Sequence, residues 1–247
     1  MKDWLKDCES KWNIDILFAC EAGSRAWGTD STESDRDLRF IYRHRDIRSY
    51  LSLKKPSEVI DYQNPIDAHG WDIFKAFQLA SKSNPSLFEW VFSPMIYEDK
   101  NGFSIRLKEI IMENYSSFAV AMHYLSLITR NLKEVSGKEI LGKKQQKQLI
   151  QIVRAILIIH EIMANGGVTH SPYFRFNEKP SGIWEYYYSL LVNAKKEDAL
   201  LKGKRMSEII VECDKEKQVL ESRCQELSKG EVFKEKLDQW LWEILGI

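Results

Sequence analysis

Two aspartates one residue apart, Asp35 and Asp37, are the residues of this chain best suited to do chemistry. They open the run Asp-Arg-Asp-Leu-Arg-Phe-Ile-Tyr, whose apolar and aromatic residues predict a β-strand. Alternate residues of a strand lie on the same face, so we expect both carboxylates to project from one side. Two negative charges held this close repel each other unless a cation lies between them. The pair therefore indicates a cation site.

A glycine and a serine, Gly23 and Ser24, precede this pair by about a dozen residues and follow an apolar run at 14–20. The run is short and rich in β-formers, which is typical of a buried strand. A turn at its end offers backbone N–H groups and a hydroxyl to phosphate oxygens. A phosphate-binding turn next to paired acids indicates a site for a nucleotide with magnesium.

The elements that must position these residues are predicted as strands first and helices later. We expect strands at 14–20, 37–43, 59–62 and 66–71, with helices at 4–12, 73–83 and 87–92. From residue 104 onward the pattern is helical, at 104–115, 118–135, 143–164, 183–193, 195–202, 206–227 and 232–245. This order predicts an α+β fold, with a catalytic domain at 1–100 and an all-helical C-terminal domain at 101–247.

Composition excludes several classes of protein. The 247 residues are 44% hydrophobic and 29% charged, and 36 basic residues balance 36 acidic ones, which argues against non-specific coating of nucleic acid. The four cysteines lack metal-binding spacing, so we expect no zinc site and a reducing cytoplasm. The N-terminus lacks the apolar core of a signal peptide. Charged residues interrupt the most apolar stretch, at 152–162, so we expect no membrane span.

Four short motifs together carry a family resemblance: Glu-Ala-Gly-Ser-Arg-Ala-Trp-Gly at 21–28, Ser-Asp-Arg-Asp-Leu-Arg at 34–39, Gly-Trp-Asp at 70–72 and Asn-Pro-Ser-Leu-Phe-Glu-Trp at 84–90. In this order they resemble the polymerase-beta-type nucleotidyltransferase superfamily. Within it, they are similar to a bacterial branch of predicted nucleotidyltransferases, some of which are associated with RNA-repair gene cassettes. The match covers residues 14–92, and the helical remainder is similar only in layout. The resemblance implies a mixed β-sheet of the nucleotidyltransferase type with flanking helices.

The resemblance also implies two divalent ions, Mg²⁺ or Mn²⁺, held by Asp35, Asp37 and a third carboxylate. Magnesium prefers a few carboxylates combined with phosphate oxygens and water, which three aspartates can supply. Asp67 is favoured as the third ligand because it lies between two apolar residues of a predicted strand. Asp72 is the alternative, although its place before a predicted helix is explained by N-capping alone.

Nucleotide-binding residues follow from the same resemblance. Gly23 would let the backbone approach the phosphates, and the Ser24 hydroxyl would donate to one of them. Arg25 and Arg39 flank the acids and could bind phosphate oxygens bidentately. For Arg39 the alternative is that its guanidinium simply neutralises the acid cluster. Glu21 is interpreted as a structural ion-pair partner.

The predicted helix at 143–164 carries two further candidates, Lys147 and Arg154. In superfamily relatives a helical domain often closes the cleft, so by analogy these cations could contact a triphosphate or an RNA phosphate. The alternative is an ordinary polar face in water. Trp27 and the aromatic run at 172–176 are interpreted as packing residues rather than base-stacking ones.

The expected reaction is nucleotidyl transfer, in which an acceptor hydroxyl attacks the α-phosphate of a nucleoside triphosphate and pyrophosphate leaves. Asp67 would accept the proton of the hydroxyl. The acceptor could be an RNA end, a protein or a small molecule. Two alternatives stay open: a nucleotide-sensing or antitoxin-like binding module without turnover, and a helical interaction protein with the first domain as scaffold. The sequence is silent on oligomeric state, on the preferred base and on the number of nucleotides added.

Overall fold

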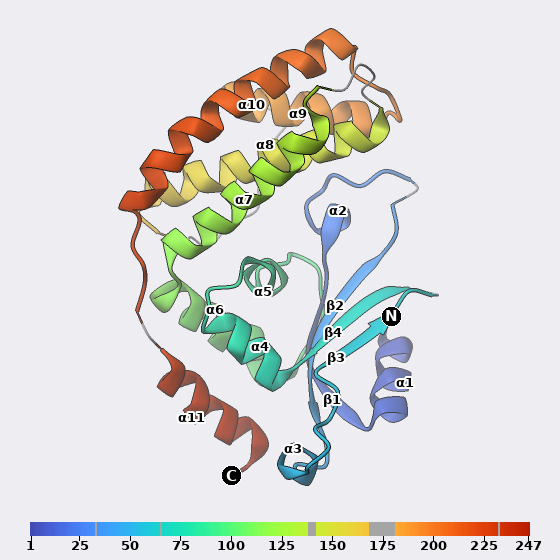
Figure 1. The fold of residues 1–247 in the computed structure, drawn as a ribbon. Coiled ribbons are helices and arrows are strands. Elements are labelled where there is room, and N and C mark those ends of the chain that lie inside the picture. Colours follow the sequence, from blue (N-terminus) through green and yellow to red (C-terminus); the bar gives the residue numbers. More distant parts are fainter. Residues whose placement is uncertain (33, 65, 138–141, 168–180, 232) are drawn as a thin grey trace. The chain divides into compact units, whose positions relative to one another are not determined.

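A computed structural model describes residues 1–247 except 33, 65, 138–141, 168–180 and 232. The described residues form two compact units, drawn together in Figure 1. The sheet unit comprises residues 1–26, 35–115 and 231–247, and the helical unit comprises 27–34 and 116–230. A mixed sheet with helices, followed by a mainly helical part, confirms the predicted α+β class. The aromatic run at 172–176 lies outside the described residues.

The sheet unit contains every strand of the described chain and the helices that pack on the sheet. Its strands are β1 (Ile14–Glu21), β2 (Asp37–His44), β3 (Val59–Tyr62), β4 (Asp67–Asp72) and β5 (Ile96–Asp99). Its helices are α1 (Lys2–Trp12), α2 (Gly23–Ala26), α3 (Arg48–Leu51), α4 (Ile73–Ala80), α5 (Pro85–Val91), the 3₁₀ turn η1 (Lys100–Gly102), α6 (Phe103–Asn114) and α11 (Lys234–Leu245).

The five described strands form one sheet in the order β3-β4-β2-β1-β5. Strand β2 lies at the centre and runs parallel to β4, whereas the other neighbouring pairs are antiparallel. The parallel register pairs Asp37 with Asp67, the first residues of β2 and β4. Because both strands begin at this edge, the sheet brings together two acids that are 30 positions apart in sequence.

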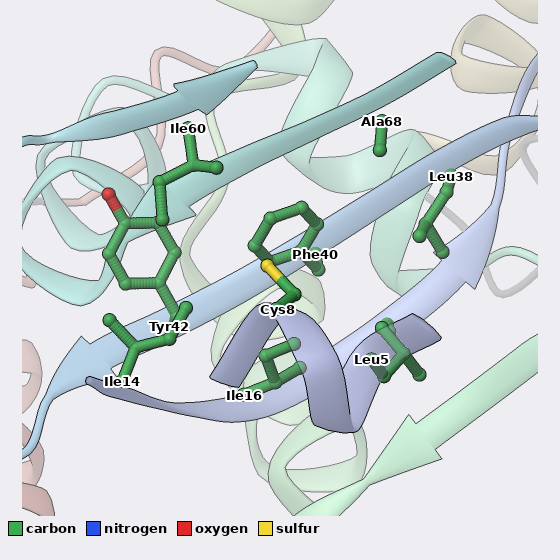
Figure 2. Packing of buried hydrophobic residues seen from close by; sticks show 10 residues of the cluster. Leu5, Cys8, Ile14, Ile16, Leu38, Phe40, Tyr42, Ile60 and Ala68 are labelled. Atoms are coloured by element: carbon green, nitrogen blue, oxygen red, sulfur yellow. The ribbon is translucent and has the colours of Figure 1, made fainter. Parts of the chain in front are cut away.

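One face of the sheet is covered by α1. Figure 2 shows Leu5 and Cys8 of α1 beside Ile16 and Phe40, in a cluster that excludes water. Close packing here also requires Gly70 on β4, because a Cβ on this residue would lie 2.2 Å from the Phe40 ring. Residues of β2 alternate across the sheet, so Leu38, Phe40 and Tyr42 in this core leave Asp37 and Arg39 to the other face.

Helices α4, α5 and α6 lie on the opposite side of the sheet from α1 (Figure 1). Asp72 caps α4 by accepting from the Phe74 N–H, and Asn84 caps α5, as its sequence Asn-Pro-Ser indicates. The C-terminal helix α11 belongs to this unit because Trp240 packs against the rings of Phe77 and Phe103, at 4.9 Å each. The division therefore differs from the predicted single boundary near residue 100: α6 and α11 both bury apolar side chains in the sheet unit.

The helical unit is built from α7 (Ser117–Val135), α8 (Lys143–Asn165), α9 (Ile183–Lys196), α10 (Gly203–Arg223) and the 3₁₀ turn η2 (Cys224–Glu226). Helix α8 is its core element, because nearly every residue from Leu149 to Ile159 is buried. Within the described residues, α8 is also the one helix long and apolar enough to cross a membrane, but 67% of its most apolar window is buried inside the protein. Burial of this kind is typical of a core helix.

One predicted helix does not form, and one strand that does form was not predicted. The predicted helix at 195–202 does not form, because α9 ends at Lys196 and α10 begins only at Gly203. The chain between them turns through Asp198, whose φ of 53° is left-handed. Strand β5 was not predicted, because its four residues, Ile-Tyr-Glu-Asp, lack a run of apolar side chains and only the edge of β1 makes them a strand.

Candidate active site

The centre of the candidate site is the pair Asp37 and Asp67 at the start of the parallel strands β2 and β4. Their side chains are 27% and 53% exposed, so both reach solvent. The Arg39 guanidinium lies between them: one nitrogen is 3.2 Å from Asp37 Oδ1 and the other is 2.9 Å from Asp67 Oδ1. The two carboxylates therefore share one cation, which offsets the repulsion between two neighbouring negative charges.

Asp35 precedes β2 and is exposed. Its backbone carbonyl accepts a hydrogen bond from Arg25 Nε at 3.2 Å, which ties the residue before the strand to helix α2. In the part of the chain that the structure describes, no three Asp, Glu, His or Cys side chains lie close enough together to hold a metal ion. The structure thus brings Asp37 and Asp67 together, while Asp35 lies near them without completing a three-ligand cluster.

Asp72, the alternative third acid, lies at the opposite end of β4, where the register pairs it with Tyr42. It lies five positions after Asp67 along the strand, a distance of about 16 Å. Its carboxylate is already used in two structural contacts: Oδ1 accepts from the Phe74 N–H at 2.9 Å, and Oδ2 accepts from the Tyr50 hydroxyl at 2.6 Å. Burial raises the pKa of Asp72. This acid caps a helix, and Asp67 is the one beside Asp37.

The Gly-Ser turn wraps directly around Asp37. Gly23 begins the short helix α2 with a left-handed φ of 61°, and the preceding N–H of Ala22 donates to the Asp37 carbonyl at 2.8 Å. Ser24 and Arg25 follow in the same turn, both half-buried. The sequence therefore predicted correctly that the turn and the acids are neighbours; phosphate binding by these residues stays a prediction.

Glu21, interpreted from sequence as a structural residue, has a more specific place than an ion pair. It is fully buried, and its Oε1 accepts the backbone N–H of Asp37 at 2.8 Å. Its Oε2 accepts from the Tyr97 hydroxyl, and its carbonyl accepts from Ser93 Oγ at 2.6 Å. Glu21 therefore fixes the backbone from which the Asp37 carboxylate projects.

The surroundings of Asp37 disfavour the ionised form of its carboxyl group. Burial raises the pKa of Asp37, and although Arg39 acts in the opposite direction, the negative charges of Asp67, Glu21 and Asp35 raise it further. A carboxylate in this environment gains from any additional positive charge.

Sequence reasoning missed His69, which pairs with Arg39 in the register of β2 and β4. Its Nδ1 contacts Asp61, and its Nε2 accepts from the Trp71 indole N–H at 2.7 Å. Because an indole N–H only donates, Nε2 is unprotonated here and Nδ1 carries the proton. Trp71 in turn stacks on Trp90 at 3.7 Å. The signal was the alternation Asp-Ala-His-Gly-Trp, which places Asp67, His69 and Trp71 on one face.

The two candidates on α8 lie in different environments. Lys147 is exposed, whereas Arg154 is only 5% exposed and its guanidinium lies 3.7 Å from the centre of the Trp27 ring. The predicted polar face of α8 therefore does not extend to Arg154, because Trp27 of the same unit covers it. Trp27 packs here, as its interpretation from sequence expected. Phosphate binding by Lys147 and Arg154 stays a prediction.

A second contact holds the chain just after Trp27 on the helical unit. Lys195 on α9 donates to the Thr29 carbonyl at 2.6 Å. Burial lowers the pKa of Lys195, and the charge of Lys147 adds to this effect. Trp27 and Thr29, which follow α2 along the chain, are thus held on the helical unit by one stacked and one hydrogen-bonded cation.

The donor set of the site fits a hard divalent cation. Carboxylate oxygens are the ligands that Mg²⁺ and Mn²⁺ accept. The Asp37 and Asp67 side chains reach solvent and already coordinate a positive group, the Arg39 guanidinium. The four cysteines are free and buried, as was expected for Cys20.

Comparison with known proteins identifies the family of this chain. A family model described as the RNA repair pathway DNA polymerase beta family matches residues 1–243. The chain belongs to this family, which confirms the polymerase-beta-type resemblance. It is also 33% identical over 169 residues to an uncharacterized Bacillus subtilis protein, YcgL. That alignment covers 67% of this chain and 63% of the relative.

Proposed function

We propose that this protein is a metal-dependent nucleotidyltransferase that transfers a nucleoside monophosphate from a nucleoside triphosphate to an acceptor hydroxyl. The observation that carries the proposal is the pair Asp37 and Asp67, presented by parallel strands and sharing one cation beside a Gly-Ser turn. Membership of a polymerase beta family supports the same class of reaction.

Asp37 and Asp67 would hold the divalent ions, with Asp35 joining them through its exposed side chain. Mg²⁺ or Mn²⁺ supplies charge stabilisation at the entering and leaving oxygens and lowers the pKa of the attacking hydroxyl. Asp67 is the more exposed acid of the central pair and is proposed to accept the hydroxyl proton. Glu21 keeps Asp37 in place through the backbone contact.

The triphosphate would lie against the turn at Gly23 and Ser24, where the chain lacks a Cβ and carries a hydroxyl. Arg25 is held near by its contact with the Asp35 carbonyl and would contribute a positive charge. We propose an RNA end as the acceptor, because the description of the family names an RNA repair pathway. A phosphate of that RNA is the proposed ligand of Lys147, which is exposed on α8.

The test is label transfer. The protein is incubated with each α-labelled nucleoside triphosphate, Mg²⁺ or Mn²⁺, and RNA, DNA, protein or no acceptor. We expect label on RNA, and loss of at least about 100-fold in rate in Asp37→Asn and Asp67→Asn. Label on another acceptor would retain the reaction and change its substrate. Nucleotide binding without transfer to any acceptor would favour the sensing module, and neither binding nor transfer would reject the active site.

A further inference from the structure

Arg39 joins the two central acids of the candidate site. Besides Asp37 and Asp67, it donates to the Leu38 carbonyl at 3.0 Å. Its side chain is 19% exposed, so part of the guanidinium reaches solvent. It lies on β2 two residues after Asp37 and therefore on the same face of the sheet.

We take the metal ion to be shared through the two carboxylate oxygens that Arg39 contacts, Oδ1 of Asp37 and Oδ1 of Asp67. A bound Mg²⁺ lies about 2.1 Å from its ligand oxygens, inside the space that a guanidinium at hydrogen-bonding distance occupies. Two positive groups also repel each other at this range. Arg39 and a metal shared by Asp37 and Asp67 therefore exclude each other.

The surroundings of Arg39 allow it to leave. Among the described residues, its further acceptor is the carbonyl of the preceding residue, Leu38, which is a neutral group. The neighbouring His69 does not hold the Arg39 guanidinium in place, because both ring nitrogens of His69 already contact Asp61 and Trp71. A guanidinium on a flexible stem binds phosphate oxygens with the same planar fork with which it binds carboxylates.

We propose that Arg39 is an exchangeable internal counter-ion: it neutralises Asp37 and Asp67 until a divalent ion takes its place, and it then binds the phosphates that arrive with the metal. The inference rests on the proposed function and assigns Arg39 two partners in succession. Arg39 thereby makes binding of metal alone weaker and binding of metal with nucleotide stronger. A permanent structural role would predict neither of these opposite effects.

Metal binding without nucleotide tests the first half. Mn²⁺ is titrated into the full-length protein, and free Mn²⁺ is followed by electron paramagnetic resonance. We expect Arg39→Gln to bind Mn²⁺ about tenfold more tightly than the unmodified protein. The matched control is Arg36→Gln, which removes the same charge from an exposed neighbour just before β2. We expect less than about a twofold change there.

Nucleotide binding tests the second half. With saturating Mn²⁺ and a non-hydrolysable triphosphate, Arg39→Gln is expected to bind nucleotide about tenfold more weakly, and Arg36→Gln about equally. Arg39→Lys retains the charge without the fork, so its affinity for Mn²⁺ should remain close to that of the unmodified protein. Circular dichroism melts verify folding, and if Arg39→Gln fails to fold, the lysine variant's loss of nucleotide affinity decides.

The outcomes separate the two proposals. If the unmodified protein binds Mn²⁺ but Arg39→Gln binds it equally or more weakly, the exchange is overturned while the nucleotidyltransferase proposal stands. If Arg39→Gln gains Mn²⁺ affinity and keeps nucleotide affinity, Arg39 competes with metal but does not bind phosphate, and the second half is overturned. If no variant binds Mn²⁺ with or without nucleotide, both proposals fail together.

Discussion

Gly23 and Asp37 approach each other so closely that only a glycine fits. A Cβ placed on Gly23 would lie 1.9 Å from Asp37 Oδ2, and the φ of Gly23 is 61°. Because this contact involves the carboxylate itself, any larger residue at the turn must displace the acid. The turn and the metal-ligand candidate are therefore one structural feature.

Replacing this glycine should impair catalysis more than stability. We expect Gly23→Ala to lower the transfer rate about 100-fold, since a shift of about 1 Å in a catalytic group has an effect of this size. The matched control is Gly28→Ala, which also has a positive φ, at 66°, but whose Cβ would meet nothing within 4 Å. Both variants should lose about 1–2 kcal/mol of stability from the left-handed backbone. Equal rates in the two variants would contradict this role for Gly23.

Asp67 and Asp72 should respond in opposite ways to mutation. We expect Asp67→Asn to abolish transfer and leave the free energy of unfolding nearly unchanged, because its side chain is 53% exposed. Asp72→Ala should lower the free energy of unfolding by about 1–2 kcal/mol through loss of the α4 cap, and should retain activity per folded molecule. Urea unfolding and initial rates measure the two effects. The reverse pattern would make Asp72 the third acid.

Asp37 should reduce stability at neutral pH. Its pKa is raised in the folded protein, chiefly by burial, so the ionised form is less favourable folded than unfolded. The penalty is absent when the group is protonated in both states. It grows as pH rises from the ordinary value of 3.8 through the raised pKa, and is then constant.

We therefore expect Asp37→Asn to be more stable than the unmodified protein at pH 7, by about 2 °C in Tm, and the gap to close on acidification. The measurement is thermal unfolding at several pH values in low metal. If the variant is instead less stable at pH 7, the contact between Asp37 and Arg39 outweighs the cost of burying the ionised carboxylate.

Trp27 should stabilise the helical unit. Trp27→Ala removes the ring that covers the buried Arg154 guanidinium, and we expect a loss of about 2–3 kcal/mol. The control is Trp242→Ala on α11, where the tryptophan is 52% exposed and a change below about 1 kcal/mol is expected. Hydrogen exchange should then show faster exchange in α8 and α9 and unchanged protection in β1 and β2. Equal loss of protection in the helices and in the sheet would contradict a stabilising role of Trp27 that is confined to the helical unit.

Much of the sheet unit could be predicted from the sequence because its signals are local. The apolar run at 14–20 predicted β1, and Asn84 and Asp72 marked the starts of α5 and α4 by their capping chemistry. Strand β5 could not be predicted, because its residues become a strand only through the exposed edge of β1. Helix α11 joins the sheet unit through the contacts of Trp240 with Phe77 and Phe103, which lie more than 100 positions away in sequence.

By itself, the sequence determined which residues are the candidates for the chemistry: an Asp-x-Asp strand, a Gly-Ser turn and a later acid at the start of another strand. Strand alternation and capping are properties of neighbouring residues, so they can be deduced without a fold. Only the tertiary structure decided that Asp67 rather than Asp72 lies beside Asp37, that Arg39 joins the two acids, and that Arg154 is covered by Trp27. Periodicity shows which face a side chain occupies, but what covers that face depends on strand register and on segments distant in sequence.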